Sequence, residues 1–143
     1  MTGDAPRLAL TATAVHPLSE DRCWELLAES RIGRLALVRS DGGPDLFPMD
    51  YLVHDRRIFL RTAPGTKLFS LAHEHRVAFE VEGRDAGMLC SVVVHGTADR
   101  LDADDEIEES GVLDLVSTSP TGKHNYIRIT PAEVTGRAFH PRA

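Results

Sequence analysis

The chain has 143 residues, 42% of them hydrophobic and 27% charged, which is ordinary for one globular domain with its own core. Its 22 acidic and 16 basic side chains give a net charge of −6, which argues against general nucleic-acid binding. No apolar run approaches the roughly 20 residues that span a bilayer, and two cysteines are too few for a disulfide framework or a zinc motif. We therefore expect a cytoplasmic protein with reduced thiols and no membrane partner.

A short amphipathic helix is the first regular element that the sequence predicts, over residues 19–29. Ser19 is a favourable N-cap, and the acidic residues 20–21 suit the positive end of the helix dipole. An apolar stripe follows at helical spacing, formed by Cys23, Trp24, Leu26 and Leu27. Residues 1–17 lack the regions of a signal peptide, so we expect a flexible lead-in and then a single domain over residues 18–143.

After residue 31 the apolar spacing changes from helical to alternating, which indicates strands. The expected strands cover residues 32–38, 45–53, 58–62, 76–81 and 89–98, the last of these the longest, with a final strand and extension over 126–130 and 134–139. Pro48 cannot donate a ladder hydrogen bond, so the second strand is bulged there or lies at a sheet edge.

Two further helices are expected, over residues 66–75 and within the acidic segment 102–117. The first would turn Leu68, Leu71 and Ala72 toward the core. A loop rich in glycine and acids is expected over 82–88. Because tight turns and not long helical crossovers join the strands, we predict a mainly β chain with short helices, built as a small antiparallel barrel.

The stretch RTAPGTKL, residues 61–68, gathers two cations and two hydroxyls at the start of the predicted 66–75 helix. Thr66 is the expected N-cap and Lys67 the first helical residue. The unpaired amides and dipole of a helix start attract anions, and Arg61, Thr62 and Lys67 add hydrogen-bond donors. The stretch therefore predicts either a phosphate site or an ordinary capped helix with surface cations.

Seven short motifs follow one another at consistent spacing from Leu18 to Phe139. They are Leu18-Ser19 with Cys23-Trp24-Glu25-Leu26-Leu27; Arg31-Ile32-Gly33-Arg34-Leu35-Ala36; Phe47-Pro48-Met49-Asp50-Tyr51; Arg61-Thr62 with Gly65-Thr66-Lys67-Leu68; Val77-Ala78-Phe79-Glu80-Val81; Ser91-Val92-Val93-Val94 with Gly96; and Ile127-Arg128-Ile129 with Thr135-Gly136-Arg137. In this series the chain resembles the pyridoxamine 5′-phosphate oxidase-like superfamily of flavin-binding split-barrel proteins, in particular its small actinobacterial members.

The resemblance implies a six-stranded antiparallel split β-barrel that forms a homodimer, with FMN, or in some relatives a deazaflavin, at the interface. It assigns the flavin phosphate to the turn, at Arg61, Thr62, Ala63, Gly65, Thr66 and Lys67. It assigns the isoalloxazine ring to the strand Phe47, Pro48, Met49, Asp50 and Tyr51, and a further flavin contact, often from the partner subunit, to Ser91 and Val92. The chain departs from many relatives in having Pro-Met-Asp-Tyr at 48–51 for Pro-Val-Asn-Tyr, and Leu89-Cys90 for Gly-Trp.

The implied function is an FMN-dependent oxidoreductase that moves a hydride between the flavin ring and a small planar substrate. Two alternatives stay open: a deazaflavin-dependent reductase of the same fold, and a non-catalytic protein that binds or senses a flavin. No catalytic residue and no metal-ligand set can be named from the sequence. This fits flavin chemistry, in which the cofactor carries the redox centre.

Several single residues have both a functional and a structural interpretation. His95 is either a proton carrier near a pocket or a solvent-facing strand residue, and Cys90 either contacts a flavin or is a buried thiol. Tyr51 either lines the flavin pocket or belongs to the core, to which Trp24 is also assigned. Arg128 and Arg137 either close over a ligand or form salt bridges. His73 and His75 point apart on a helix, which argues against a metal site.

Overall fold

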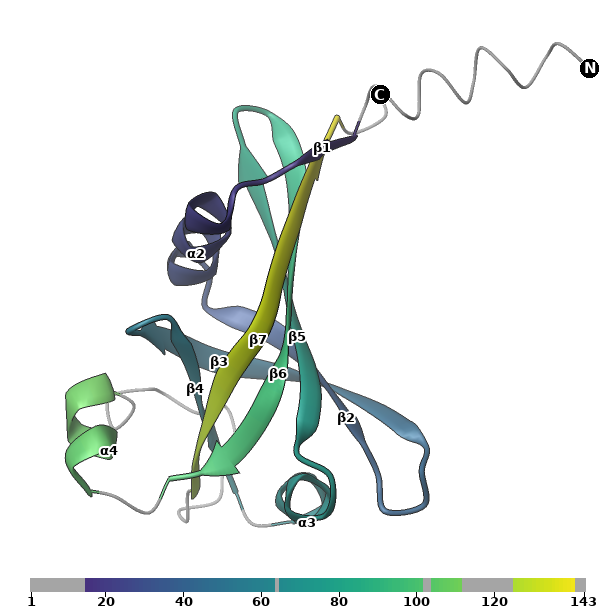
Figure 1. Cartoon of the computed structure of the whole chain (residues 1–143), viewed down its shortest axis with the longest axis vertical. Helices are drawn as coiled ribbons and strands as arrows, with labels where there is room; N and C mark the ends of the chain where they lie inside the picture. The colour runs from purple at the N-terminus through teal and green to yellow at the C-terminus, as the bar shows by residue number, and fades with distance from the viewer. Residues whose placement is uncertain (1–14, 64, 102–103, 112–124, 141–143) are drawn as a thin grey trace, which may run out of the picture.

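The computed structural model describes residues 15–63, 65–101, 104–111 and 125–140 (Figure 1). The strands are β1 (Val15–Pro17), β2 (Ile32–Val38), β3 (Pro44–His54), β4 (Arg57–Thr62), β5 (Arg76–Asp85), β6 (Met88–Arg100) and β7 (Asn125–Phe139). The helices are α2 (Glu20–Glu29), α3 (Thr66–His73) and α4 (Asp104–Ser110).

Antiparallel pairing closes the sheet on itself. The strands follow the order β1-β7-β4-β3-β2-β5-β6, and an additional β6–β7 pairing joins the end of this row back to β7. Strands β2 to β7 therefore form a ring of six, with β1 added along the outer end of β7. The predicted mainly β fold, a six-stranded antiparallel split barrel, is confirmed.

The core fills the ring because inward residues of every barrel strand are apolar. The largest fully buried side chains alternate along the strands, as they must when one face of each strand is turned inward. They include Leu35, Ile58, Leu60, Phe79, Val81, Val92, Val94, Ile127 and Ile129. A smaller apolar cluster lies outside the ring, where Phe59 of β4 meets Leu101 and Ile107.

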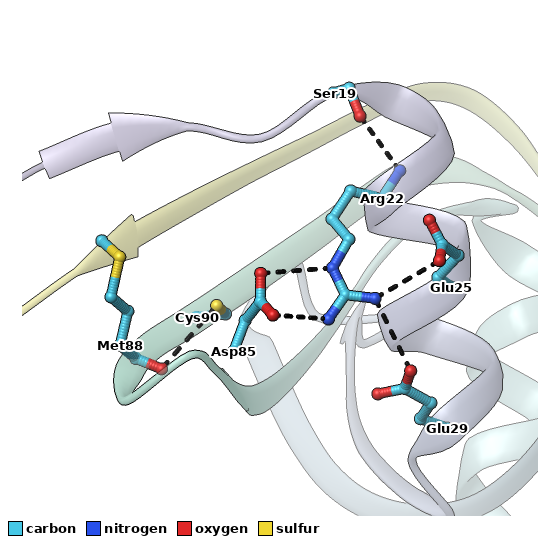
Figure 2. A network of polar contacts seen from close by, with 7 residues as sticks. All are labelled: Ser19, Arg22, Glu25, Glu29, Asp85, Met88 and Cys90. Atoms are coloured by element: carbon cyan, nitrogen blue, oxygen red, sulfur yellow. Dashed lines mark hydrogen bonds and ion pairs between the residues drawn. The ribbon is translucent and has the colours of Figure 1, made fainter.

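Helix α2 packs its buried stripe on the barrel and is held at both ends. The Ser19 hydroxyl accepts a hydrogen bond from the Arg22 amide at 3.1 Å, which confirms the predicted N-cap. The Arg22 guanidinium reaches Asp85 on the β5–β6 hairpin, with N···O distances of 3.0 and 3.3 Å, and also faces Glu25 and Glu29 (Figure 2). This two-point contact fixes the helix to a hairpin more than 60 residues away in sequence.

Tyr51 joins the other end of α2 to the barrel. Its side chain is 3% exposed, its hydroxyl donates to the Leu27 carbonyl, and its ring meets Phe79 edge-on at 4.9 Å. The carbonyl belongs to the last turn of α2, where the helix itself supplies no amide donor. Burial raises the pKa of Tyr51 to about 12, so the hydroxyl stays protonated and donating. Tyr51 is thus a core residue.

The structure corrects several predicted boundaries. Val15–Pro17, expected in the flexible lead-in, pairs with β7 as β1, because the outer end of β7 offers a free edge. The loop expected over 82–88 is mostly strand, and only Ala86 and Gly87 turn, both at positive φ. In a hairpin with a two-residue turn, strand pairing continues up to the residues that flank the turn, here Asp85 and Met88. The glycine and acidic residues of 82–88 had suggested a loop instead.

The longest strand is β7 and not the predicted 89–98 strand. We expected a break between 126–130 and 134–139, but β7 runs through. A shift of register between His95 and Gly96 of β6 leaves Ala132 without a cross-strand partner. This bulge accommodates Pro131, so the proline does not end the strand. Of the predicted helix within 102–117, α4 covers 104–110, and residues 112–117 lie outside the described part of the chain.

We predict that Gly96→Ala strongly destabilises the barrel. A Cβ at Gly96 would lie 2.2 Å from the Thr130 carbonyl oxygen, a backbone atom of the facing strand, so β6 and β7 would have to separate. Overpacking of this kind costs about 1–3 kcal/mol. Chemical denaturation should show this loss, whereas the control Gly83→Ala, whose new Cβ would stand at an ordinary 3.4 Å from Leu26, should change stability by less than about 0.5 kcal/mol. Equal stabilities of the two variants would contradict the close approach.

We predict that Tyr51→Phe costs about 1–2 kcal/mol, because it leaves the Leu27 carbonyl without its donor while keeping the ring in place. The folded-state pKa of about 12 lies above the unfolded value near 10. The stability that Tyr51 contributes is therefore complete below pH 10 and is lost as pH rises through 12. Denaturation curves at several pH values should show a steeper decline above pH 10 for the parent than for Tyr51→Phe. Parallel declines would show that Tyr51 ionises normally in the fold.

Candidate functional site

The turn between β4 and α3 places the RTAPGTKL residues around the start of a helix. Strand β4 ends with Arg61 half-buried and Thr62 buried, and the Thr62 hydroxyl donates to the Ala63 carbonyl at 3.3 Å. Gly65 then precedes the helix at φ 156°, a value that favours glycine, and no described atom other than those of its chain neighbours lies within 4 Å of where its Cβ would stand. The space beside Gly65, at the start of α3, is therefore open.

We predicted Thr66 as the N-cap of α3, but the N-cap is Gly65. Thr66 is the first helical residue and Lys67 the second. A glycine has no side chain, so no side-chain hydrogen bond caps this helix start. Among the described residues, no side-chain acceptor pairs with the first backbone amides of α3, and the helix dipole adds positive potential at the same place. With Thr66 exposed and Lys67 half-buried beside it, the turn suits an anion.

The same turn meets strand β3. The Lys67 Nζ lies over the ring of Phe47, 4.8 Å from its centroid, a cation–π contact. The two stretches that the resemblance assigned to one ligand, 47–51 and 61–67, are therefore brought together although no motif in the sequence indicates this contact.

Strand β3 has an open edge beside this contact. It pairs with β2 along residues 44–50 but with β4 only from Tyr51 to His54, so one edge of 44–50 has no partner among the described strands. Pro48 lies in this stretch, which confirms the predicted edge position. An unpaired edge presents backbone N–H and C=O groups that can hydrogen-bond a polar ligand.

The side chains of β3 divide between the two faces of the sheet. Met49 and Tyr51 are buried in the core, and Phe47 packs against it half-buried, whereas Pro48 is exposed and Asp50 half-buried on the outer face. Of these residues, Met49 and Tyr51 can meet a ligand at the open edge only through their backbone. Phe47, Met49, Tyr51 and Val53 thus share one face of β3.

Ser91 and Val92 lie on β6, which two strands, β5 and β2, separate from β3. Val92 is 1% exposed and belongs to the core, while the Ser91 hydroxyl donates to Glu80 at 3.3 Å on the outer face. Glu80 in turn accepts from Arg34 of β2 at 2.9 Å. Within one chain, Ser91 is therefore not brought to the β4–α3 turn. The alternating pattern of the strand around Glu80 indicates that this residue faces outward. Its hydrogen bonds with Ser91 and Arg34 depend on strand pairing, which the sequence does not show.

The remaining residues that had both a functional and a structural interpretation lie in the core or on the surface. Cys90 is buried, and burial raises the pKa of its thiol, which keeps it protonated. Trp24 is buried in the core as predicted, and His95 is exposed on β6. Arg137 is exposed and Arg128 lies 3.9 Å from Asp99. Ala72 of α3, predicted to face inward, is exposed, and Ser70 and Leu71 are the buried pair. Helix α3 ends at His73, two residues earlier than expected.

The described part of the chain lacks two kinds of feature. No group of three or more His, Cys, Asp or Glu side chains lies close enough to hold a metal ion. No helix in this part of the chain is long and apolar enough to cross a membrane.

Comparison with known proteins places this geometry in a family. The family model for pyridoxamine 5′-phosphate oxidase matches residues 19–138. A protein of Corynebacterium glutamicum, provisionally described as a pyridoxamine 5′-phosphate oxidase, has a solved structure with 41% identity and a TM-score of 0.78, over 89% of this chain and 99% of that one.

Two further solved structures are described as FAD-binding proteins. The one from Mycobacterium smegmatis is 30% identical over 89% of this chain and all of the other, and the one from Mesorhizobium loti is 28% identical over 87% and 97%; both have TM-scores of 0.74. With the model matching most of its length and relatives covering it almost end to end, the chain belongs to the pyridoxamine 5′-phosphate oxidase family of split-barrel proteins.

Proposed function

We propose that this protein binds a flavin nucleotide, FMN in its simplest form, with the phosphate at the start of α3, and that it acts as a homodimeric oxidoreductase on a small planar molecule. The observation that carries the proposal is the conjunction of the uncapped start of α3 with the open edge of β3, joined by the Lys67–Phe47 contact. The description of two relatives as FAD-binding supports a flavin as the cofactor class.

The phosphate is assigned to the groups that converge on Gly65. The amides at the start of α3 donate to it without competition from a side-chain cap, and Thr66 adds an exposed hydroxyl. Lys67 and Arg61 supply positive charge. Thr62 and Ala63 shape the turn through their mutual hydrogen bond and hold the end of β4 in place.

The ring is assigned to the open edge of β3. Its polar edge would pair with backbone groups of residues 47–51, so the burial of Met49 and Tyr51 does not stand against the assignment. The bound flavin supplies the redox chemistry, exchange of a hydride with the substrate, and the chain supplies binding and orientation. No side chain is assigned a catalytic role.

The homodimer is assigned to the outer face of β2, β3, β5 and β6. Ile32 and Leu46 are each 60% exposed on this face, an unusual position for large apolar side chains. The pairing register sets Leu46, Ala36, Ala78 and His95 in one row across the four strands. A partner chain against this face would bring its own Ser91 toward the ring site, which one chain cannot do.

We predict that Lys67→Ala and Arg61→Ala each weaken FMN binding about tenfold or more, equivalent to about 1.5–3 kcal/mol for a charge-assisted contact. The quenching of flavin fluorescence on titration with protein measures the affinity. The control Arg57→Ala removes a cation from the β3–β4 hairpin, away from α3, and should leave FMN affinity unchanged. Unchanged affinity in both test variants would move the phosphate elsewhere, and an absence of FMN binding by the parent would refute the proposed function.

We predict that Leu46→Lys converts the dimer into monomers, because it replaces one of the two most exposed apolar side chains of the proposed interface with a charge. Sedimentation velocity measures the change. The control Val15→Lys introduces the same charge at a 40% exposed apolar residue of β1, outside the proposed interface, and should leave the dimer intact. A dimer that persists in Leu46→Lys would rule out this face as the interface.

A further inference from the structure

A cavity of about 480 Å³ lies along α3, next to the proposed phosphate site and separate from the open edge of β3. It begins at Gly65 and follows the helix past Phe69 to Ala72, with Ala98 of β6 and Ile127 of β7 as its other wall. In Figure 1, α3 is seen end-on at the end of the barrel, beside the last residues of β6. The volume lies in the range of small-molecule sites.

The walls of this cavity favour a flat, weakly polar ring. Phe69 is 64% exposed, the most exposed large apolar side chain among the described residues. An exposed aromatic face beside small aliphatic groups such as Ala72 and Ala98 offers a stacking surface. No other element in the described part of the chain uses this ring in an aromatic pair.

The rim of the cavity carries hydrogen-bond acceptors. The His75 Nδ1 lies 3.1 Å from the Ala98 carbonyl, which can only accept, and the neutral tautomer that donates this bond from Nδ1 has Nε2 as an acceptor. The Asp99 carboxylate lies 3.8 Å from His75 and is 47% exposed. Acceptors at the edge of an apolar slot suit a ring with an exocyclic amine, or a sugar with two hydroxyls. Arg100, which also lines the cavity, is suited to a phosphate.

We propose that this cavity binds the adenosine half of FAD, so that the protein prefers FAD to FMN. Gly65 belongs both to the cavity and to the proposed phosphate site, so a ligand can continue from one into the other. From Gly65 to Ala72 the helix rises about 10 Å, about the length of a ribose and an adenine laid along it, so the second phosphate would stay near Gly65. The inference rests on the proposed function, because it takes the first phosphate to lie at the start of α3.

The test compares FMN and FAD binding to the full chain by fluorescence titration. FAD should bind at least about tenfold more tightly than FMN, and Phe69→Ala should remove most of that difference while changing FMN affinity little. Ala72→Leu, which fills the cavity from an exposed helix position, should do the same. Val15→Ala, at another exposed apolar residue, should leave both affinities as in the parent.

A second measurement uses adenosine alone, which carries no phosphate. Millimolar adenosine should weaken FAD binding and leave FMN binding unchanged, because only FAD would use the cavity. Equal affinities for FMN and FAD, or an equal loss of both in Phe69→Ala, would overturn the adenosine site and leave the proposed function standing. Binding of neither flavin would overturn both.

Discussion

The pairing of β6 with β7 is the constraint on which the rest of this structure depends. It runs from Leu89 opposite Phe139 to Arg100 opposite Ile127, and it turns an open row of strands into a ring. The ladder survives Pro131 only because Ala132 bulges out and Gly96 lets the backbones approach. Once β7 is fixed, it holds β4 on its other edge, and β4 delivers residues 61 and 62 to the start of α3. The position of the candidate site therefore depends on the closure of the barrel by β6 and β7.

The barrel uses its inward side chains for stability and leaves its backbone edges for binding. Along β3 the inward residues Met49 and Tyr51 are buried, and Tyr51 also ties α2 to the barrel. The open edge of the same strand and the uncapped start of α3 are backbone features, which tolerate many side chains nearby. A site built in this way can stay in place while side chains around it change. The chain, with Pro-Met-Asp-Tyr at 48–51, can therefore offer the same backbone edge as a relative with other side chains there.

Much of the fold was predictable from the sequence because its patterns are local. The Ser19 cap, the apolar stripe of α2 and the alternation of β2 and β3 each depend on a few neighbouring residues, and each is confirmed. The errors arose where a distant strand decides the outcome. β1 forms because β7 offers it an edge, and β7 continues through Pro131 because β6 accommodates a bulge. The identity of the α3 cap was missed because threonine is a common N-cap, whereas here Gly65 takes the conformation that precedes the helix.

The candidate site was only partly predictable for the same reason. The density of cations and hydroxyls in RTAPGTKL points to an anion, but the Lys67–Phe47 contact and the open edge of β3 follow from tertiary structure. The most direct test of the central claim, that the start of α3 holds a flavin phosphate, is a comparison of FMN with riboflavin, which lacks the phosphate. FMN should bind about 100-fold more tightly than riboflavin to the parent, and Lys67→Ala should reduce that ratio about tenfold or more without weakening riboflavin. Equal binding of FMN and riboflavin by the parent would contradict the account.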